Sequence, residues 1–116
     1  MRIAVGADHA GYLLRRAIIK ALKEDGHEVL DMGTDSPESV DYPDYARAVA
    51  ESIQEGRAER GVCICGSGAG VAMTAAKFKG IRAATVHDCF TAHQAVEHDD
   101  LNVLCLGSLV VGEWLA

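Results

Sequence analysis

Residues 61–70 read GVCICGSGAG and join an apolar run to a glycine-rich loop. Positions 62–65 are all apolar, which is typical of a strand that is covered on both faces in a parallel sheet. The alternating glycines that follow allow the backbone to turn sharply. The helical pattern of residues 71–78 begins directly afterwards. The stretch therefore predicts a strand, a tight loop and a helix in immediate succession.

The same alternation of short β-branched runs and longer helical patterns covers the whole chain. Strands are expected at Arg2–Gly6, Glu28–Asp31, Gly61–Cys65, Ile81–Val86 and Val103–Gly107, and helices at Tyr12–Asp25, Tyr45–Glu55, Val71–Phe78 and Thr91–Glu97, with a fifth helix starting near Leu109. Strands that alternate with helices form βαβ units and a parallel sheet. We therefore expect residues 1–116 to form one α/β domain, a three-layer α/β/α sandwich around a parallel sheet of about five strands.

The composition excludes several classes of protein. Hydrophobic residues make up 49% and charged residues 24% of the chain, the balance of a soluble globular protein. No apolar run reaches the ~18 residues of a membrane span. The net charge is −6 and the basic residues are scattered, so neither nucleic acid nor a membrane is an expected partner.

Cysteine usage indicates the compartment and argues against a metal. Four cysteines without an export signal predict reduced thiols in the cytoplasm. Cys63 and Cys65 form a C-x-C pair, which is neither the redox C-x-x-C spacing nor a zinc knuckle. No second ligand pair follows, so we expect no metal site.

The glycine loop is the first candidate for a binding site. Ligands of open α/β sheets bind beyond the carboxyl ends of the strands, where this loop lies. Backbone N–H groups around Gly66, Gly68 and Gly70 can converge on one anion, and the N-terminus of the next helix reinforces them. The loop matches neither the Walker A nor the dinucleotide motif. The structural alternative is a tight turn in which Ser67 is the helix N-cap.

Cys65 is the candidate catalytic base, because it ends the strand and faces the helix N-terminus. Helix N-termini favour the thiolate, which is the form that accepts a proton. The alternative is a buried strand cysteine, which is our interpretation of Cys63 and Cys105.

Two further groups of polar residues are candidates. Asp8 and His9 follow the first strand and can exchange protons with a substrate oxygen, or Asp8 can cap the first helix. Tyr42 opens the second helix and could line a pocket or be structural. His98 and Asp99 end the fourth helix, at the amino edge of their own sheet, where a histidine commonly interacts with the helix dipole. A catalytic His98 would have to serve the site of a neighbouring subunit.

Five segments in order closely resemble ribose-5-phosphate isomerase type B and the related galactose-6-phosphate isomerase subunits. The segments are Gly6–Gly11 (GADHAG), Asp41–Pro43 (DYP), Cys63–Gly70 (CICGSGAG), Ala76–Ala83 (AKFKGIRA) and Glu97–Leu104 (EHDDLNVL). The resemblance implies a Rossmann-like dimer, in some members a tetramer, with each site shared between two subunits. It also implies conversion of ribose 5-phosphate, a small sugar phosphate, to ribulose 5-phosphate without a metal or organic cofactor. One branch of the family carries a glutamate just after the glycine loop, whereas Cys65 and Val71 place this chain in the cysteine branch.

The resemblance assigns roles to the residues around the bond that reacts. Cys65 would move the proton between carbons 2 and 1, and Ser67 would shuttle protons between the oxygens. The amides of Gly66–Gly70 would hold the enediolate.

It also assigns roles at the two ends of the sugar. His98 from the partner subunit would help to open the furanose ring together with Asp8. His9 and Tyr42 would line the sugar and its phosphate end.

Two departures from the family pattern concern substrate binding. Asp99 stands where many members carry an asparagine that binds the enediolate, and a carboxylate there would repel the intermediate unless it is protonated or turned away. Leu109 stands where the family carries a phosphate-binding arginine, and residues 110–116 do not supply the further arginines of the family's C-terminal helix. An isomerase of another, unphosphorylated aldose and a weakly active sugar-binding paralogue therefore remain alternatives.

Overall fold

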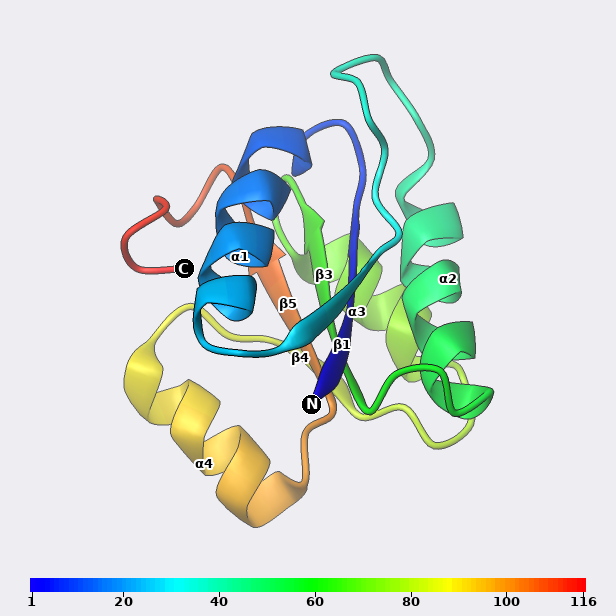
Figure 1. Ribbon diagram of the computed structural model, residues 1–116, viewed down its shortest axis with the longest axis vertical. Coiled ribbons are helices and arrows are strands. Elements are labelled where there is room, and N and C mark those ends of the chain that lie inside the picture. The colour runs from blue at the N-terminus through cyan, green and yellow to red at the C-terminus, as the bar shows by residue number, and fades with distance from the viewer.

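Five parallel strands form the centre of the molecule (Figure 1). The computed structural model describes residues 1–116. The strands are β1 (Arg2–Ala7), β2 (Glu28–Asp31), β3 (Arg60–Cys65), β4 (Ala83–Thr85) and β5 (Val103–Gly107). They lie in the order β2-β1-β3-β5-β4, and every neighbouring pair is parallel.

The chain crosses from one half of the sheet to the other between β1 and β3. From β1 it passes to the edge strand β2, and only then to β3 on the other side of β1. In open α/β sheets such a switch point leaves a crevice at the carboxyl ends of the two strands. In this sheet the switch point lies between β1 and β3, beside the loops that follow Ala7 and Cys65.

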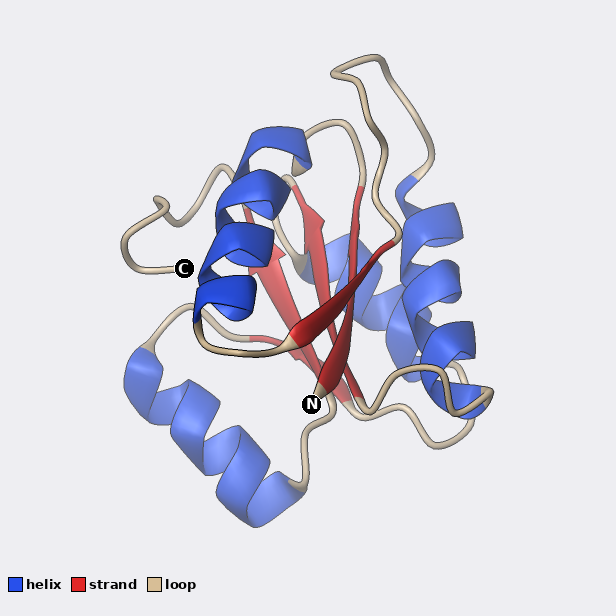
Figure 2. Ribbon diagram, in the orientation of Figure 1, coloured by secondary structure: helices blue, strands red, loops and turns tan.

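Helices cover both faces of the sheet (Figure 2). They are α1 (Tyr12–Glu24), α2 (Tyr42–Gln54), α3 (Ala69–Ala76) and α4 (Cys89–Asp99). One buried cluster lies under α2 and α3 and includes Val49 and Val71, and the other lies under α1 and includes Leu14 and Ile18. The expected three-layer, Rossmann-like α/β/α sandwich with five parallel strands is therefore confirmed.

The ends of several elements differ from the expectation. Helix α2 begins at Tyr42 because Pro43, whose fixed φ suits a first turn, is part of the helix. The expected fifth helix near Leu109 is wrong. Residues 108–116 instead form two turns, closed by N–H donation from Val111 to Gly107 and from Ala116 to Gly112.

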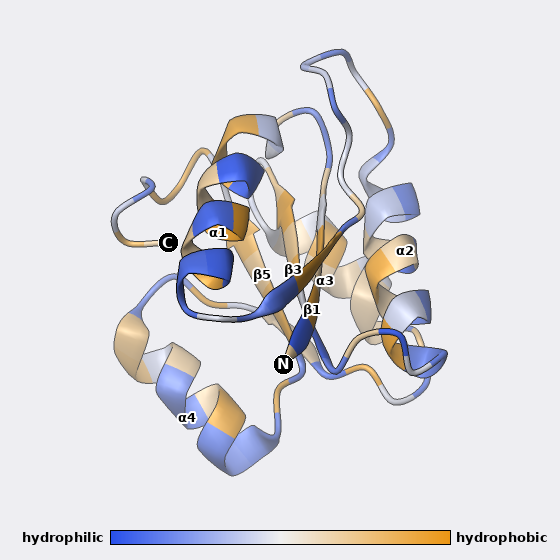
Figure 3. Cartoon of the chain, in the orientation of Figure 1, coloured by the Kyte–Doolittle hydropathy of each residue, from blue (hydrophilic) through white to orange (hydrophobic).

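Helix α4 is less buried than the other helices. Only Ala95 of this helix is buried, whereas Phe90 and Val96 are 73% and 40% exposed. Figure 3 shows apolar colour along α4 as well as in the central strands β3 and β5. None of the helices has both the length and the apolar character needed to span a membrane.

Candidate functional site

The glycine loop brings a thiol and a helix N-terminus together at the end of β3. Cys65 is the last residue of β3 and is buried. The backbone N–H of Gly68 donates to Cys65 Sγ over 3.2 Å. Gly68 is the N-cap of α3 and has a φ of 81°, a conformation that glycine adopts without strain. The turn thus aims a backbone donor at the sulfur of Cys65.

Residues at the ends of β4 and β5 hold the glycine loop in place through hydrogen bonds to its carbonyl groups. The hydroxyl of Thr85, at the end of β4, donates to the carbonyl of Gly68 over 2.7 Å. After β5, the N–H groups of Ser108 and Leu109 donate to the carbonyls of Cys65 and Gly66 over 2.9 and 3.0 Å. The sequence pattern did not point to Thr85 or Ser108, although Thr85 ends β4 and Ser108 directly follows β5 at the carboxyl edge.

Ser67 lies at the exposed tip of the loop. Its Oγ accepts a hydrogen bond from the Ala69 N–H over 3.1 Å, which forms a local turn before α3. The N-cap of α3 is Gly68 and the helix has no side-chain cap, so the alternative in which Ser67 is the N-cap is wrong. The hydroxyl proton of Ser67 is not engaged by this bond and can still be donated.

The loop after β1 lies directly beside Cys65. The N–H of Asp8 donates to the Ile64 carbonyl over 3.2 Å, which ties the two strand ends together. Asp8 is buried, and its Oδ1 accepts from the N–H groups of Ala10 and Gly11 over 2.9 and 3.1 Å. Asp8 therefore shapes the turn before α1. Its Oδ2 forms no hydrogen bond with the protein and is the oxygen that a ligand can use.

His9 and Tyr42 lie on the same side as the glycine loop. The Nδ1 atom of His9 accepts from the Val40 N–H over 3.1 Å, so a neutral ring carries its proton on Nε2. Tyr42 packs against Gly70, where a Cβ atom would lie 2.6 Å from Tyr42 Cε1. His9 can therefore donate a hydrogen bond through Nε2. Tyr42, at the start of α2, packs against the glycine loop at Gly70.

His98 and Asp99 do not join this group within one chain. Both are exposed at the end of α4, which leads into the amino end of β5. Cys65 is paired with Gly107 at the other end of β5 (Figure 1). The structure therefore brings Cys65, Ser67, Asp8, His9, Tyr42 and the three glycines to one edge and leaves His98 and Asp99 at the opposite edge.

The other cysteines differ from Cys65 in their surroundings. Cys63 lies one pleat below it, fully buried and paired with Cys105 of β5. A hydrogen bond with Cys105 and burial raise the pKa of the Cys63 thiol well above its usual value. Cys63 is thus held as a neutral thiol. No group of three or more His, Cys, Asp or Glu side chains is arranged to hold a metal ion.

Comparison with known proteins identifies the family. Residues 3–116 match the family model described as Ribose/Galactose Isomerase. The chain belongs to this family.

The ribose/galactose isomerase family contains several well-matched relatives. Ribose-5-phosphate isomerase B of Escherichia coli is 45% identical over 99% of this chain and 77% of the relative. A galactose-6-phosphate isomerase subunit of Clostridium acetobutylicum is 40% identical over 97% of this chain and 65% of the relative. The structure of ribose-5-phosphate isomerase B from Clostridium thermocellum superposes with a TM-score of 0.97, at 48% identity, over 99% of this chain and 78% of that one.

The comparisons confirm the resemblance found in the sequence. The chain is an isomerase of the family that includes ribose-5-phosphate isomerases of type B, and its fold is theirs. The names of these relatives refer to two different sugar phosphates, ribose 5-phosphate and galactose 6-phosphate. The substrate, the roles of the site residues and the oligomeric state stay predictions.

Proposed function

We propose that the protein interconverts ribose 5-phosphate and ribulose 5-phosphate through an enediolate, with Cys65 as the general base. The observation that carries the proposal is the Gly68 N–H directed at Cys65 Sγ at the end of β3. In the forward direction the thiolate takes the proton from carbon 2 of the open-chain aldose. The resulting thiol returns a proton to carbon 1, so the enzyme ends the cycle unchanged.

The glycine loop would stabilise the charge that develops on the substrate oxygen. The amides of Gly66–Gly70 follow the thiol and lead into the N-terminus of α3, whose dipole favours an anion. A single preorganised N–H donor of this kind typically contributes about 10²–10³ in rate. The hydroxyl of Ser67, at the exposed loop tip, would carry the proton that moves between the two oxygens.

The loop after β1 and the start of α2 would bind the rest of the sugar. The unengaged Oδ2 of Asp8 can accept a proton from a ring hydroxyl as the furanose opens. The Nε2–H of His9 can donate to a sugar or phosphate oxygen, since Nδ1 is occupied by Val40. Tyr42 is 40% exposed and presents its ring beside Gly70.

We also propose a homodimer in which the partner's α4 completes each site. His98 is exposed at the edge opposite to Cys65, so it can reach a site only on another subunit. The exposed Phe90 and Val96 give α4 an apolar surface that a partner would cover. Asp99 would then lie near the enediolate, where its side chain must turn away or carry a proton.

One set of variants tests both the base and the shared site. Cys65→Ala should abolish the conversion of ribose 5-phosphate, whereas the matched control Cys89→Ala removes an exposed thiol and should retain it. Mixing inactive Cys65→Ala and His98→Ala subunits should restore about a quarter of the parent activity, because half of the randomly formed dimers hold one intact site of two. Activity retained in Cys65→Ala would rule out Cys65 as the general base. Mixtures that stay inactive would place His98 outside a shared site.

A second candidate function is favoured by Leu109. This side chain is 85% exposed and overhangs the glycine loop, with Cδ1 3.4 Å from a Cβ atom placed on Gly66. An apolar group there offers no charge to a phosphate and favours an unphosphorylated aldose. The ratio of kcat/KM for ribose 5-phosphate and for ribose, measured in the parent and in Leu109→Arg, separates the two. A parent that prefers ribose, and a variant that prefers the phosphate, would support the second candidate.

A further inference from the structure

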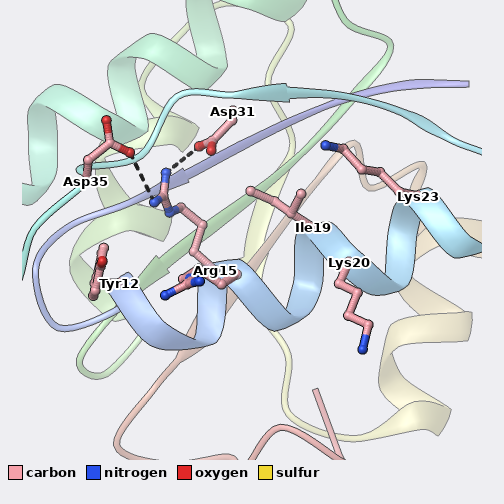
Figure 4. A pocket seen from close by; sticks show the side chains of 8 residues that line it. Tyr12, Arg15, Ile19, Lys20, Lys23, Asp31 and Asp35 are labelled. Carbon is pink, nitrogen blue, oxygen red and sulfur yellow. Dashed lines mark hydrogen bonds and ion pairs between the residues drawn. The ribbon is translucent and has the colours of Figure 1, made fainter.

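A buried arginine lies between α1 and the chain segment at the end of β2. Arg15 is 4% exposed, and its guanidinium forms an ion pair with Asp31, the last residue of β2 (Figure 4). A second, longer contact joins Nη2 to Asp35 Oδ1 over 3.4 Å. The Tyr12 ring lies 5.8 Å from the guanidinium carbon. A buried cation is costly unless it is paired, and here one acidic partner ends β2 and the other lies in the segment that follows.

The backbone after β2 passes directly over this arginine. A Cβ atom on Gly33 would lie 2.2 Å from Arg15 Cδ and 2.8 Å from both Nε and Nη1. The Gly33 N–H also donates to Asp31 Oδ1 over 3.2 Å, the oxygen that Arg15 binds. Residues 31–35 therefore wrap around one side chain, and a Cβ atom at Gly33 would have to displace the end of Arg15.

This wrapped segment is the base of the loop that leads to the candidate site. Thr34 is the last residue of the loop with a backbone bond to the sheet, an N–H donated to the Ala7 carbonyl over 3.2 Å. Residues 36–39 form only an internal bond, from the Glu38 N–H to Ser36 Oγ. The next attachment is the Val40 N–H bond to His9, and Tyr42 follows at once. The path of the loop thus depends on its attachments at the two ends.

We infer that Arg15 is a positioning residue, which fixes the loop of residues 32–41 so that His9 and Tyr42 face the glycine loop. Its cavity of ≈ 580 Å³ is also lined by Arg16, Lys20 and Lys23. None of these three side chains forms a hydrogen bond or an ion pair with the loop, and the one ion pair among them joins Lys20 to Glu24 of the same helix over 4.0 Å. Arg15 is the side chain of α1 that is bonded to Asp31 and Asp35, and the two carboxylates offset its charge. It acts on the reaction through the loop and does not touch the substrate.

The kinetic effect expected of Arg15 variants rests on the proposed function. Contacts from His9 and Tyr42 to the unreacting part of a sugar are equally strong in the ground state and in the transition state. Losing them raises KM and leaves kcat unchanged. We expect Arg15→Ala to raise KM for ribose 5-phosphate about tenfold with kcat within about twofold of the parent. Arg15→Lys keeps the charge but not the planar fork and should be intermediate.

Gly33→Ala tests the same contact from the loop side. Its methyl group displaces the guanidinium and should reproduce the rise in KM, whereas Gly112→Ala, with nothing within 4 Å of the new methyl group, should not. Because Arg15→Ala removes the atoms that the methyl group would meet, the double variant should be no worse than the worse single variant. The exposed Arg16→Ala, from the same cavity, should match the parent.

Amide hydrogen exchange gives a readout that does not require activity. In Arg15→Ala and in Gly33→Ala the Val40 N–H should exchange at least about tenfold faster, while the amides of β3 keep the parent rate. Unchanged exchange at Val40, or a loss confined to kcat, would overturn the inference. If the parent does not isomerise ribose 5-phosphate, the proposed function fails, and the exchange at Val40 alone then tests the role of Arg15. If Arg15→Ala does not fold, Arg15→Lys and Gly33→Ala carry the same comparison.

Discussion

Replacing Gly68 by alanine should damage both stability and activity, and the structure gives the size of each effect. A φ of 81° costs an L-residue about 1–2 kcal/mol. The new Cβ atom would also lie 2.9 Å from Gly107 N, Leu106 C and Thr85 Cγ2. Two of these atoms are backbone and cannot rotate away, so relieving the overlap should cost a further ~1–3 kcal/mol. The sum, about 2–5 kcal/mol, is a large part of the ~5–15 kcal/mol that stabilises a typical domain.

Gly80→Ala is the matched control, because Gly80 has the same φ of 81° but no atom within 4 Å of the added methyl group. It should lose only the backbone cost of about 1–2 kcal/mol. At roughly 4 °C per kcal/mol, thermal unfolding should show a loss of about 8–20 °C for Gly68→Ala and about 4–8 °C for Gly80→Ala. The shifted loop would also misdirect the Gly68 N–H, and kcat/KM should fall about 10²–10³-fold in Gly68→Ala only. Equal melting temperatures with full activity in both variants would refute the argument.

Two further predictions follow from titratable groups. Iodoacetamide should alkylate the exposed Cys89 in the folded protein, whereas Cys63, a buried thiol whose pKa is raised, should react only after unfolding. Peptide mass spectrometry of partly labelled protein checks this, and labelling of Cys63 before Cys89 would contradict it. The backbone N–H and the hydroxyl of Thr91 lower the pKa of the Asp88 carboxyl below its ordinary value of 3.8. The folded-state pKa is therefore the lower one, so the stabilisation of the start of α4 is complete above the ordinary value and is lost as the pH falls through the folded-state value. Amide exchange at Thr91 should accelerate over that acidic range in the parent and not in Asp88→Asn, and identical profiles would contradict the assignment.

Local patterns were enough to predict the layers of the fold and the residues at the carboxyl edge. The apolar run of β3 and the helical stripes specify their own elements, and the position of a residue after a strand places it at one edge of a parallel sheet. This argument located Cys65 and Asp8 correctly, because each directly follows or ends a strand.

Features that depend on distant segments were not predicted. The hydrogen bond from Thr85 to Gly68 depends on a strand order in which β5 lies between β3 and β4. No local sequence pattern encodes this order. Arg15 occupies a position on α1 that a helical pattern leaves polar, and its burial arises from the segment after β2. The helix expected near Leu109 does not continue beyond one turn. Val111 closes that turn on Gly107, and Gly112, which follows directly, is unfavourable inside a helix.

The position of β5 has a consequence for the order in which the protein can become active during its synthesis. Until Val103–Gly107 has left the ribosome, β4 has no sheet partner and β3 has an unpaired edge. The bonds that fix the carbonyls of Cys65 and Gly66 come from Ser108 and Leu109, which are made later still. Pairings between segments so far apart in the chain form slowly. A nascent chain therefore carries Cys65 without the framework that organises the glycine loop, and the loop is completed only when β5 is inserted.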